Sequence, residues 1–325
     1  MERRISKNRA IARFTFMLRA LILLGIGVFT ASPLASAPRF SDWSAPQNLG
    51  PMVNSASVDV GPAISKDGLS LYFTSNRPGG FGNFDIWVTQ RDSVDSPWKQ
   101  PVNLGPAINT GALESIPALS RDGHWLFFNS DRPGGFGMVD VWASYRFDKH
   151  DDFGWQPPIN LGPGVNSAFL DQGASFFEND DGGSPLLFFG SDRPGGSGLL
   201  DIYVSERMAD GSFGNAKLIP ELNTSRNDQR AVVRFDGLEL FFFSDRTGVG
   251  NDDLFVSTRE TVDDAWSEPM NLGPTVNSAF RDVQAYIASD RETLFFASNR
   301  PPADCPLGCG SFDLYVTTRT KIKGP

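Results

Sequence analysis

Histidine and cysteine are scarce in this chain of 325 residues, which contains two of each. His124 lies beside an Asp-Gly turn and His150 in the sequence DKHDD. The chain therefore has almost no histidine from which a catalytic triad or a zinc site could be built. The serines lie in turn sequences such as NSA and SDR, and no GxSxG motif occurs. The sequence therefore disfavours nucleophilic hydrolysis by serine or cysteine and predicts no metal site.

Long helical periodicity is absent after roughly the first forty residues, whereas 33 glycines and 23 prolines provide many turns. One run of sequence returns five times: a turn that is Asp-Gly in the first four copies, an apolar aromatic pair, a Ser-x-Arg loop and an Asp-apolar-aromatic segment. Equivalent aromatic residues recur at intervals of 55, 57, 58 and 53 residues. They are Trp43, Trp98, Trp155, Phe213 and Trp266. This period is typical of propeller blades or solenoid units.

The repeats predict an all-β fold with four strands in each repeat. Paired aromatic residues place large side chains on both faces of one strand, so both faces must be covered. These pairs are Tyr72-Phe73, Phe127-Phe128, Phe188-Phe189, Phe241-Phe242 and Phe295-Phe296. Because each blade of a propeller packs between its neighbours, we predict a five-bladed β-propeller, with a solenoid as the alternative.

The two ends of the repeat region complete one blade in this interpretation. The last copy stops after its third strand, DLYVTTR, and lacks an outer strand. Residues 43–50 read WSAPQNLG, which matches the outer strand of the other repeats. We therefore expect the N-terminal strand to close the last blade, which removes the free edges between the first and last blades.

Residues 1–37 have a different composition from the repeats. A basic stretch is followed by an apolar run and then by small residues ending in Ala35-Ser36-Ala37, the three-part plan of a secretory signal. We expect a signal peptide in residues 1–37, one propeller domain in residues 38–325, and a periplasmic or secreted bacterial protein. Pro38 and Arg19 argue against cleavage, so an uncleaved membrane anchor is the alternative.

The chain is acidic, with a formal net charge of −9. An acidic surface repels nucleic acid and anionic lipid, so neither is an expected partner, and a membrane contact is expected only through an uncleaved N-terminal segment. An envelope protein or a glycan at a propeller face fits better, and we expect a monomer. Cys305 and Cys309 could close a local disulfide in an oxidising compartment, with metal binding as the alternative.

Carboxylates are the one candidate catalytic or binding group. An acidic residue lies five positions after the Asn of each VN, IN or LN pair, where the innermost strand begins. These residues are Asp59, Glu114, Asp171, Asp228 and Asp282. Symmetry would place all five at one mouth of the central channel. Unpaired carboxylates at close range would raise one another's pKa, so cationic partners are expected.

Two interpretations of this acidic ring remain open. An arginine follows the second strand of each repeat, and five acids with five arginines could form a structural belt. These arginines are Arg77, Arg132, Arg193, Arg246 and Arg300. The functional alternative is a mouth that collects a cation, a sugar or a basic side chain. A glycosidase needs a pair of carboxylates, and five-bladed propellers do host such enzymes, so a carbohydrate-active propeller is the second hypothesis.

The glycine-rich loops end in an aspartate that we expect to cap loop amides, because glycines permit the positive φ of tight turns. These residues are Asp85, Asp140, Asp201, Asp253 and Asp313. The loops are similar to calcium-binding nonapeptides, but their aspartate comes one residue later. We expect no cofactor, with calcium as the alternative.

The sequence from Asp59, DVGPAISKDGLSLYFTSNRPGGFGNFDIWV, resembles the WD40-like propeller repeat of the TolB type, also called PD40, and so does the copy from Glu114. The resemblance covers about residues 42–319 and is specific for the fold rather than for a function. It implies an exported, non-catalytic binding or scaffold module of the cell envelope. That is our first functional hypothesis, and whether the protein is an enzyme stays open.

Overall fold

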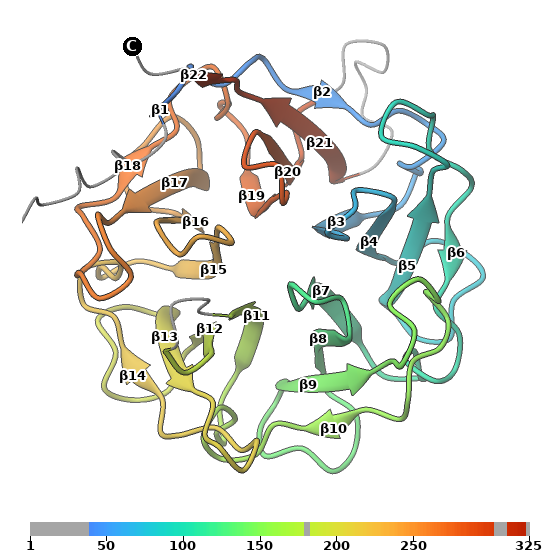
Figure 1. The fold of residues 1–325 in the computed structure, drawn as a ribbon, viewed down its shortest axis with the longest axis horizontal. Helices are drawn as coiled ribbons and strands as arrows, with labels where there is room; N and C mark the ends of the chain where they lie inside the picture. The colour runs from blue at the N-terminus through green and yellow to red at the C-terminus, as the bar shows by residue number, and fades with distance from the viewer. Residues whose placement is uncertain (1–38, 179–182, 302–310, 323–325) are drawn as a thin grey trace, which may run out of the picture. The chain divides into compact units, whose positions relative to one another are not determined.

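The computed structural model describes residues 39–178, 183–301 and 311–322. Five four-stranded antiparallel sheets are arranged around a central axis, which confirms the predicted five-bladed propeller (Figure 1). No helix forms within the described ranges, so none of these residues belongs to a helix that could cross a membrane. The predicted signal segment and both cysteines lie outside the described residues.

Each blade runs from an inner strand at the axis to a short outer strand. The inner strands are β3 (Asp59–Ile64), β7 (Glu114–Leu119), β11 (Asp171–Phe177), β15 (Asp228–Val233) and β19 (Asp282–Ile287). The second strands are β4 (Ser70–Ser75), β8 (Trp125–Ser130), β12 (Leu186–Ser191), β16 (Glu239–Ser244) and β20 (Thr293–Ser298). The third strands are β5 (Asp85–Gln90), β9 (Asp140–Tyr145), β13 (Asp201–Glu206), β17 (Asp253–Thr258) and β21 (Asp313–Thr318). The outer strands are β6 (Val102–Asn103), β10 (Ile159–Asn160), β14 (Lys217–Leu218), β18 (Met270–Asn271) and β2 (Gln47–Asn48).

The fifth blade is closed by the N-terminal strand β2, as the sequence predicts. Gln47 pairs with Val316 and Asn48 with Tyr315 of β21, so the outer strand of this sheet comes from the other end of the chain. The adjoining strands β1 (Arg39–Phe40) and β22 (Lys321–Ile322) also pair antiparallel. Opening this ring would therefore break pairings between residues separated by most of the sequence.

The aromatic pairs of the second strands are buried on both faces, because each sheet packs between two others. Tyr72, Phe73, Phe128, Phe189 and Phe242 are among the fully buried side chains. Burial of an aromatic side chain stabilises a fold by about 1.5–3 kcal/mol, so these pairs supply much of the driving force for packing blade on blade.

An asparagine from the loop before each inner strand joins neighbouring blades. The side chain of Asn109 accepts a hydrogen bond from the backbone N–H of Ile86 at 2.9 Å and donates to the C=O of the same residue at 2.9 Å. Asn54 forms the corresponding pair with Leu314 across the closing junction. The Asn of the repeated VN or IN pair thus completes the hydrogen bonding of a third strand in the preceding blade.

Every inner strand contains a bulge at its third residue. Pairing with the second strand shifts after the second residue in all five blades. The residue at the bulge has positive φ, which is uncommon outside glycine. These residues are Gly61 (63°), Ile116 (51°), Gly173 (66°), Arg230 (49°) and Gln284 (58°). A Cβ built on Gly61 would lie 3.0 Å from Nη1 of Arg230 and 3.3 Å from Cα of Ile116, so this position faces the central channel.

The aromatic residues that set the sequence period are stacking platforms for arginines that follow the third strands. Arg91 lies 4.4 Å from the ring centre of Trp98, and Arg146 lies 4.4 Å from that of Trp155. Arg259 on Trp266 and Arg319 on Trp43 form the same cation–π pair. The third blade is the exception: Phe213 replaces tryptophan, and Arg207 lies over Trp125 of the second blade instead. An apolar cavity of about 40 Å³ lies beside Phe213.

Phe213→Trp should stabilise the protein, because the larger ring fills this cavity and offers Arg207 a platform. At ~24 cal/mol per Å³, filling 40 Å³ contributes about 1 kcal/mol, and an exposed cation–π pair adds ~0.5–1 kcal/mol. Urea unfolding of the variant measures the gain. The matched control, Trp155→Phe in the second blade, should lose a comparable amount, and an unchanged or lower stability of Phe213→Trp would contradict the assignment.

Candidate functional site

The five acids that the sequence places at the channel entrance each occupy the first position of an inner strand, and each is fully buried. Asp59 accepts hydrogen bonds from the backbone N–H and the hydroxyl of Ser55, at 2.6 and 2.8 Å, and from Arg77 at 2.6 Å. Glu114 accepts from the backbone N–H and hydroxyl of Thr110, from Ser130 and from Arg132. Asp171, Asp228 and Asp282 have the corresponding Ser or Thr and Arg partners.

The arginine partner of each acid comes from the same blade and is itself enclosed. Arg77 also donates to the C=O of Val53 and to the hydroxyl of Ser75, and its guanidinium lies between the rings of Phe73 and Trp87. The same ion pair forms in the other four blades, so each pair joins an inner strand to the loop after the second strand. The ion pairs are Arg132–Glu114, Arg193–Asp171, Arg246–Asp228 and Arg300–Asp282. These carboxylates present no surface to a ligand.

The aspartates at the starts of the third strands hold the glycine-rich loops. Asp85 accepts from the backbone N–H of Phe81 at 2.8 Å and of Gly82 at 3.3 Å, and Asp140, Asp201 and Asp253 make equivalent contacts. Burial raises the pKa of Asp85 and of Asp201 above the ordinary value. Asp313 accepts a hydrogen bond from Asn48 at 3.0 Å. Within the described part of the chain, no group of three or more His, Cys, Asp or Glu residues is placed to hold a metal ion.

Accessible carboxylates lie at the same end of the channel, at the variable position of the Ser-x-Arg motif. This position, which the sequence analysis did not single out, is Asn76, Asp131, Asp192, Asp245 and Asn299 in blades one to five. Each side chain accepts a hydrogen bond from the backbone N–H of the residue that precedes an inner-strand acid. Among the described residues none of the three aspartates forms an ion pair. We call Asp131, Asp192 and Asp245 the mouth carboxylates.

Exposed apolar side chains lie in the loops at this same end of the propeller. The loops after the second strands and those before the inner strands meet there because the strands are antiparallel. The exposed residues are Phe81, Phe136, Met138, Phe169, Leu199 and Phe280. The mouth face, defined by these residues and the mouth carboxylates, therefore combines carboxylates that form no ion pair with the described residues and exposed apolar side chains.

The opposite end of the propeller carries a polar groove between the first and second blades. It has a volume of about 540 Å³ and is lined by residues that include both histidines, Asp67, Asp122 and Lys149. Burial alone would raise the pKa of Asp67, but hydrogen bonds from Ser65 and Leu69 and the nearby His150 together outweigh it, so the pKa lies below its ordinary value. The two histidines are separated by 26 residues in the sequence, and the fold brings them to one shared groove.

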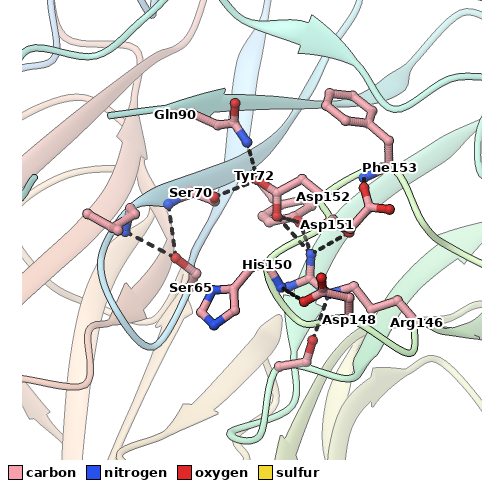
Figure 2. Close-up of polar contacts among 12 residues, drawn as sticks. Ser65, Ser70, Tyr72, Gln90, Arg146, Asp148, His150, Asp151, Asp152 and Phe153 are labelled. Atoms are coloured by element: carbon pink, nitrogen blue, oxygen red, sulfur yellow. Dashed lines mark hydrogen bonds and ion pairs between the residues drawn. The ribbon is translucent and has the colours of Figure 1, made fainter. Parts of the chain in front are cut away.

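A buried hydrogen-bond network lies beside this groove and is centred on Asp152 (Figure 2). The carboxylate accepts from Ser70, Tyr72 and Gln90 of the first blade, at 2.5, 2.5 and 2.7 Å. From the second blade it accepts a bond from Arg146 at 2.7 Å. Burial, followed by the charge of Asp152, raises the pKa of Tyr72 well above its ordinary value. The network joins two blades through a side chain of the loop after β9.

Solved structures with a similar fold are mostly glycoside hydrolases. The catalytic domain of the GH62 α-L-arabinofuranosidase from Coprinopsis cinerea has a TM-score of 0.58 at 13% identity, and the match covers 87% of this chain and 98% of that one. The α-L-arabinofuranosidase from Lactobacillus brevis has a TM-score of 0.57 at 13% identity, covering 84% and 93%. TolB from Acinetobacter baumannii matches at a TM-score of 0.46 and 13% identity, covering 81% of this chain and 55% of that one. No protein-family model and no curated protein matches the chain.

These comparisons contradict the first functional hypothesis, a non-catalytic scaffold of the cell envelope. The similar structures are mostly glycoside hydrolases, among them arabinofuranosidases and arabinanases, matched at 12–16% identity. The error has a physical origin, because the TolB-type repeat signature describes residues that build a blade. The signature leaves positions such as the variable residue of Ser-x-Arg unspecified, so the repeat cannot predict what the propeller binds.

Replacing a buried ring acid should cost far more stability than replacing a mouth carboxylate twenty-one residues later in the same blade. Asp171→Asn leaves the enclosed Arg193 without its counter-charge, and breaking a buried ion pair costs about 3–5 kcal/mol. Asp192→Asn should change the unfolding free energy by less than about 0.5 kcal/mol, since its side chain is exposed. Urea unfolding of both variants tests the distinction, and equal losses would contradict it.

Asp152→Asn should destabilise the junction of the first two blades by about 3–5 kcal/mol, the cost of breaking a buried ion pair. The substitution leaves Arg146 buried without a carboxylate and removes an acceptor shared by Ser70 and Gln90. Hydrogen exchange should show faster opening of β4 and β9 than of β16 and β17, which lie in another blade. Uniform loosening of all blades would show that the network is not a local junction.

Proposed function

We propose that this propeller is a carbohydrate-active protein that binds an oligosaccharide at the mouth face. The observation that carries the proposal is that, among the described residues, three carboxylates on successive blades form no ion pair and lie at the same end of the propeller as exposed phenylalanine rings. Sugar hydroxyls are hydrogen-bond donors that suit carboxylate acceptors, and charge-assisted hydrogen bonds are about twice as strong as neutral ones. The fold likeness to arabinofuranosidases and arabinanases supports the choice of ligand class.

The asymmetry of the mouth face also favours a ligand site. The buried ring is acidic in all five blades, whereas the mouth position is aspartate only in blades two, three and four. Stability requires the same contact in each blade, but recognition of an unsymmetrical sugar chain requires different groups around the channel. The mouth position is charged in three successive blades and neutral in the other two, so the mouth has one acidic side, which supports recognition of an unsymmetrical ligand.

Hydrolysis would require two carboxylates with different tasks on either side of one glycosidic bond. The inner ring cannot supply that pair, because each of its acids is buried against an arginine. Among the described residues at this end of the channel, the candidates for a catalytic pair are therefore Asp131, Asp192 and Asp245. The same three residues are proposed for sugar binding and for hydrolysis. An activity assay distinguishes a protein that only binds the sugar from one that also hydrolyses it.

Binding is tested by calorimetric titration with arabinotriose and cellotriose. We expect one of these sugars to bind, and each single replacement, Asp131→Asn, Asp192→Asn or Asp245→Asn, to weaken its binding about tenfold or more. A hydrogen bond to a charged group contributes ~1.5–3 kcal/mol, and 1.4 kcal/mol is tenfold in affinity. Release of reducing sugar from arabinan by the wild type, lost in these variants, would establish hydrolysis.

The groove between the first two blades provides the matched control. Lys149→Gln and His150→Gln alter polar side chains of comparable exposure on the opposite end of the propeller. They should leave sugar affinity unchanged. If these groove variants abolish binding and the mouth variants do not, the proposed site is wrong; if neither sugar nor arabinan binds, the proposed ligand class is wrong.

A further inference from the structure

Arg230 is a buried charge at the centre of the propeller that no other described residue neutralises. Its side chain belongs to the bulge of β15 and is 2% exposed. Every other buried arginine in the described segments has a carboxylate partner: Arg146 pairs with Asp152, Arg234 with Glu239, and Arg319 with Glu239. Arg230 forms no ion pair within the described ranges.

The hydrogen bonds of this guanidinium are also incomplete. Nη2 donates to the C=O of Pro62 at 2.9 Å and to that of Pro117 at 3.3 Å. Nε and Nη1 are enclosed and have no partner. Burial of an unpaired charge and of unsatisfied donors is among the most costly features a fold can contain, so the site requires an acceptor.

A further unused donor lies at the same level of the channel. Asn129 accepts a hydrogen bond from the backbone N–H of Gly173 at 2.9 Å, while its Nδ2 is buried without a partner. Gly173 in turn adjoins Arg230, because a Cβ built on the glycine would lie 3.3 Å from both Cα and Cβ of Arg230. Asn129 therefore lies beside the inner strand that adjoins the backbone of Arg230, while the guanidinium reaches across to Pro62 and Pro117.

The neighbouring tyrosine does not provide the missing negative charge. Tyr286 donates its hydroxyl to the C=O of Leu119 at 3.5 Å, and burial raises its pKa to about 12. Burial lowers the pKa of Arg230 to about 9, so near neutral pH the arginine is charged and the tyrosine is neutral. Gln284 contributes an unpartnered carbonyl oxygen but no charge.

We propose that the central channel binds a small inorganic anion of the size of chloride, held by the Nε–H and Nη1–H groups of Arg230. A single anion would neutralise the buried charge and accept hydrogen bonds from the unused N–H groups. It must be small because the inner-strand bulges of neighbouring blades close on the site, with Nη1 of Arg230 only 3.0 Å from where a Cβ of Gly61 would lie. The site is independent of the mouth face and of its proposed sugar.

Unfolding midpoints in sodium chloride and in sodium gluconate of equal ionic strength test the proposal. Chloride should raise the thermal unfolding midpoint by roughly 2–4 °C for each tenfold increase in chloride concentration once the site is filled, since a ligand of the native state stabilises by mass action. Gluconate is too large to enter the site and should not raise the midpoint in this way. The chloride-specific rise should vanish in Arg230→Gln and persist in Arg226→Gln, which removes the same charge from an exposed position four residues earlier.

Crystals of the wild-type protein grown in sodium bromide provide a test that needs no variant. An anomalous bromide peak within hydrogen-bond distance of Nε or Nη1 of Arg230 would support the proposal. Ordered water there without anomalous signal would overturn it, as would an equal chloride effect in the wild type and in Arg230→Gln. These outcomes do not depend on any result with arabinotriose or cellotriose.

Discussion

The ion pair between a buried carboxylate and an enclosed arginine is the contact on which each blade depends. A carboxylate at the first residue of the inner strand fixes the preceding loop through a backbone N–H and a hydroxyl, and it fixes the following loop through the arginine. Asp59 and Arg77 show the full set, because the guanidinium also packs between Phe73 and Trp87. Burial of charges is costly unless every lone pair and donor is used, and here most of them are.

Within the repeat, the positions that stabilise each blade are different from the positions proposed to bind ligands. The ring acids, their arginines and the loop aspartates recur in every blade, so they build the scaffold. Individual chemistry lies at positions that differ between blades. The residue after the second strand is Asn, Asp, Asp, Asp and Asn around the ring, and the bulge residue is Gly, Ile, Gly, Arg and Gln. The proposed sugar site uses the first of these positions and the proposed anion site uses the second.

The sequence alone predicts the blade number, the strand order and closure by the N-terminal strand, because all three follow from the spacing of Trp43 and its equivalents and from the incomplete last repeat. It also identifies the five acids and five arginines as candidate partners in a structural belt. Burial of the acids is not predictable from spacing, since the loop that caps Asp59 with Ser55 folds back only in three dimensions. The bulge at Arg230 breaks the two-residue alternation of a strand, so an alternating pattern cannot place its side chain in the channel.

A double-mutant cycle on the first blade tests the central role of the ion pair most directly. Asp59→Asn, Arg77→Gln and the double variant are compared with the wild type by urea unfolding. If the two side chains stabilise the blade through each other, the coupling free energy should be at least about 2 kcal/mol, at the upper end of values for residues in contact. A coupling near zero would show that the two residues contribute independently and would contradict the account.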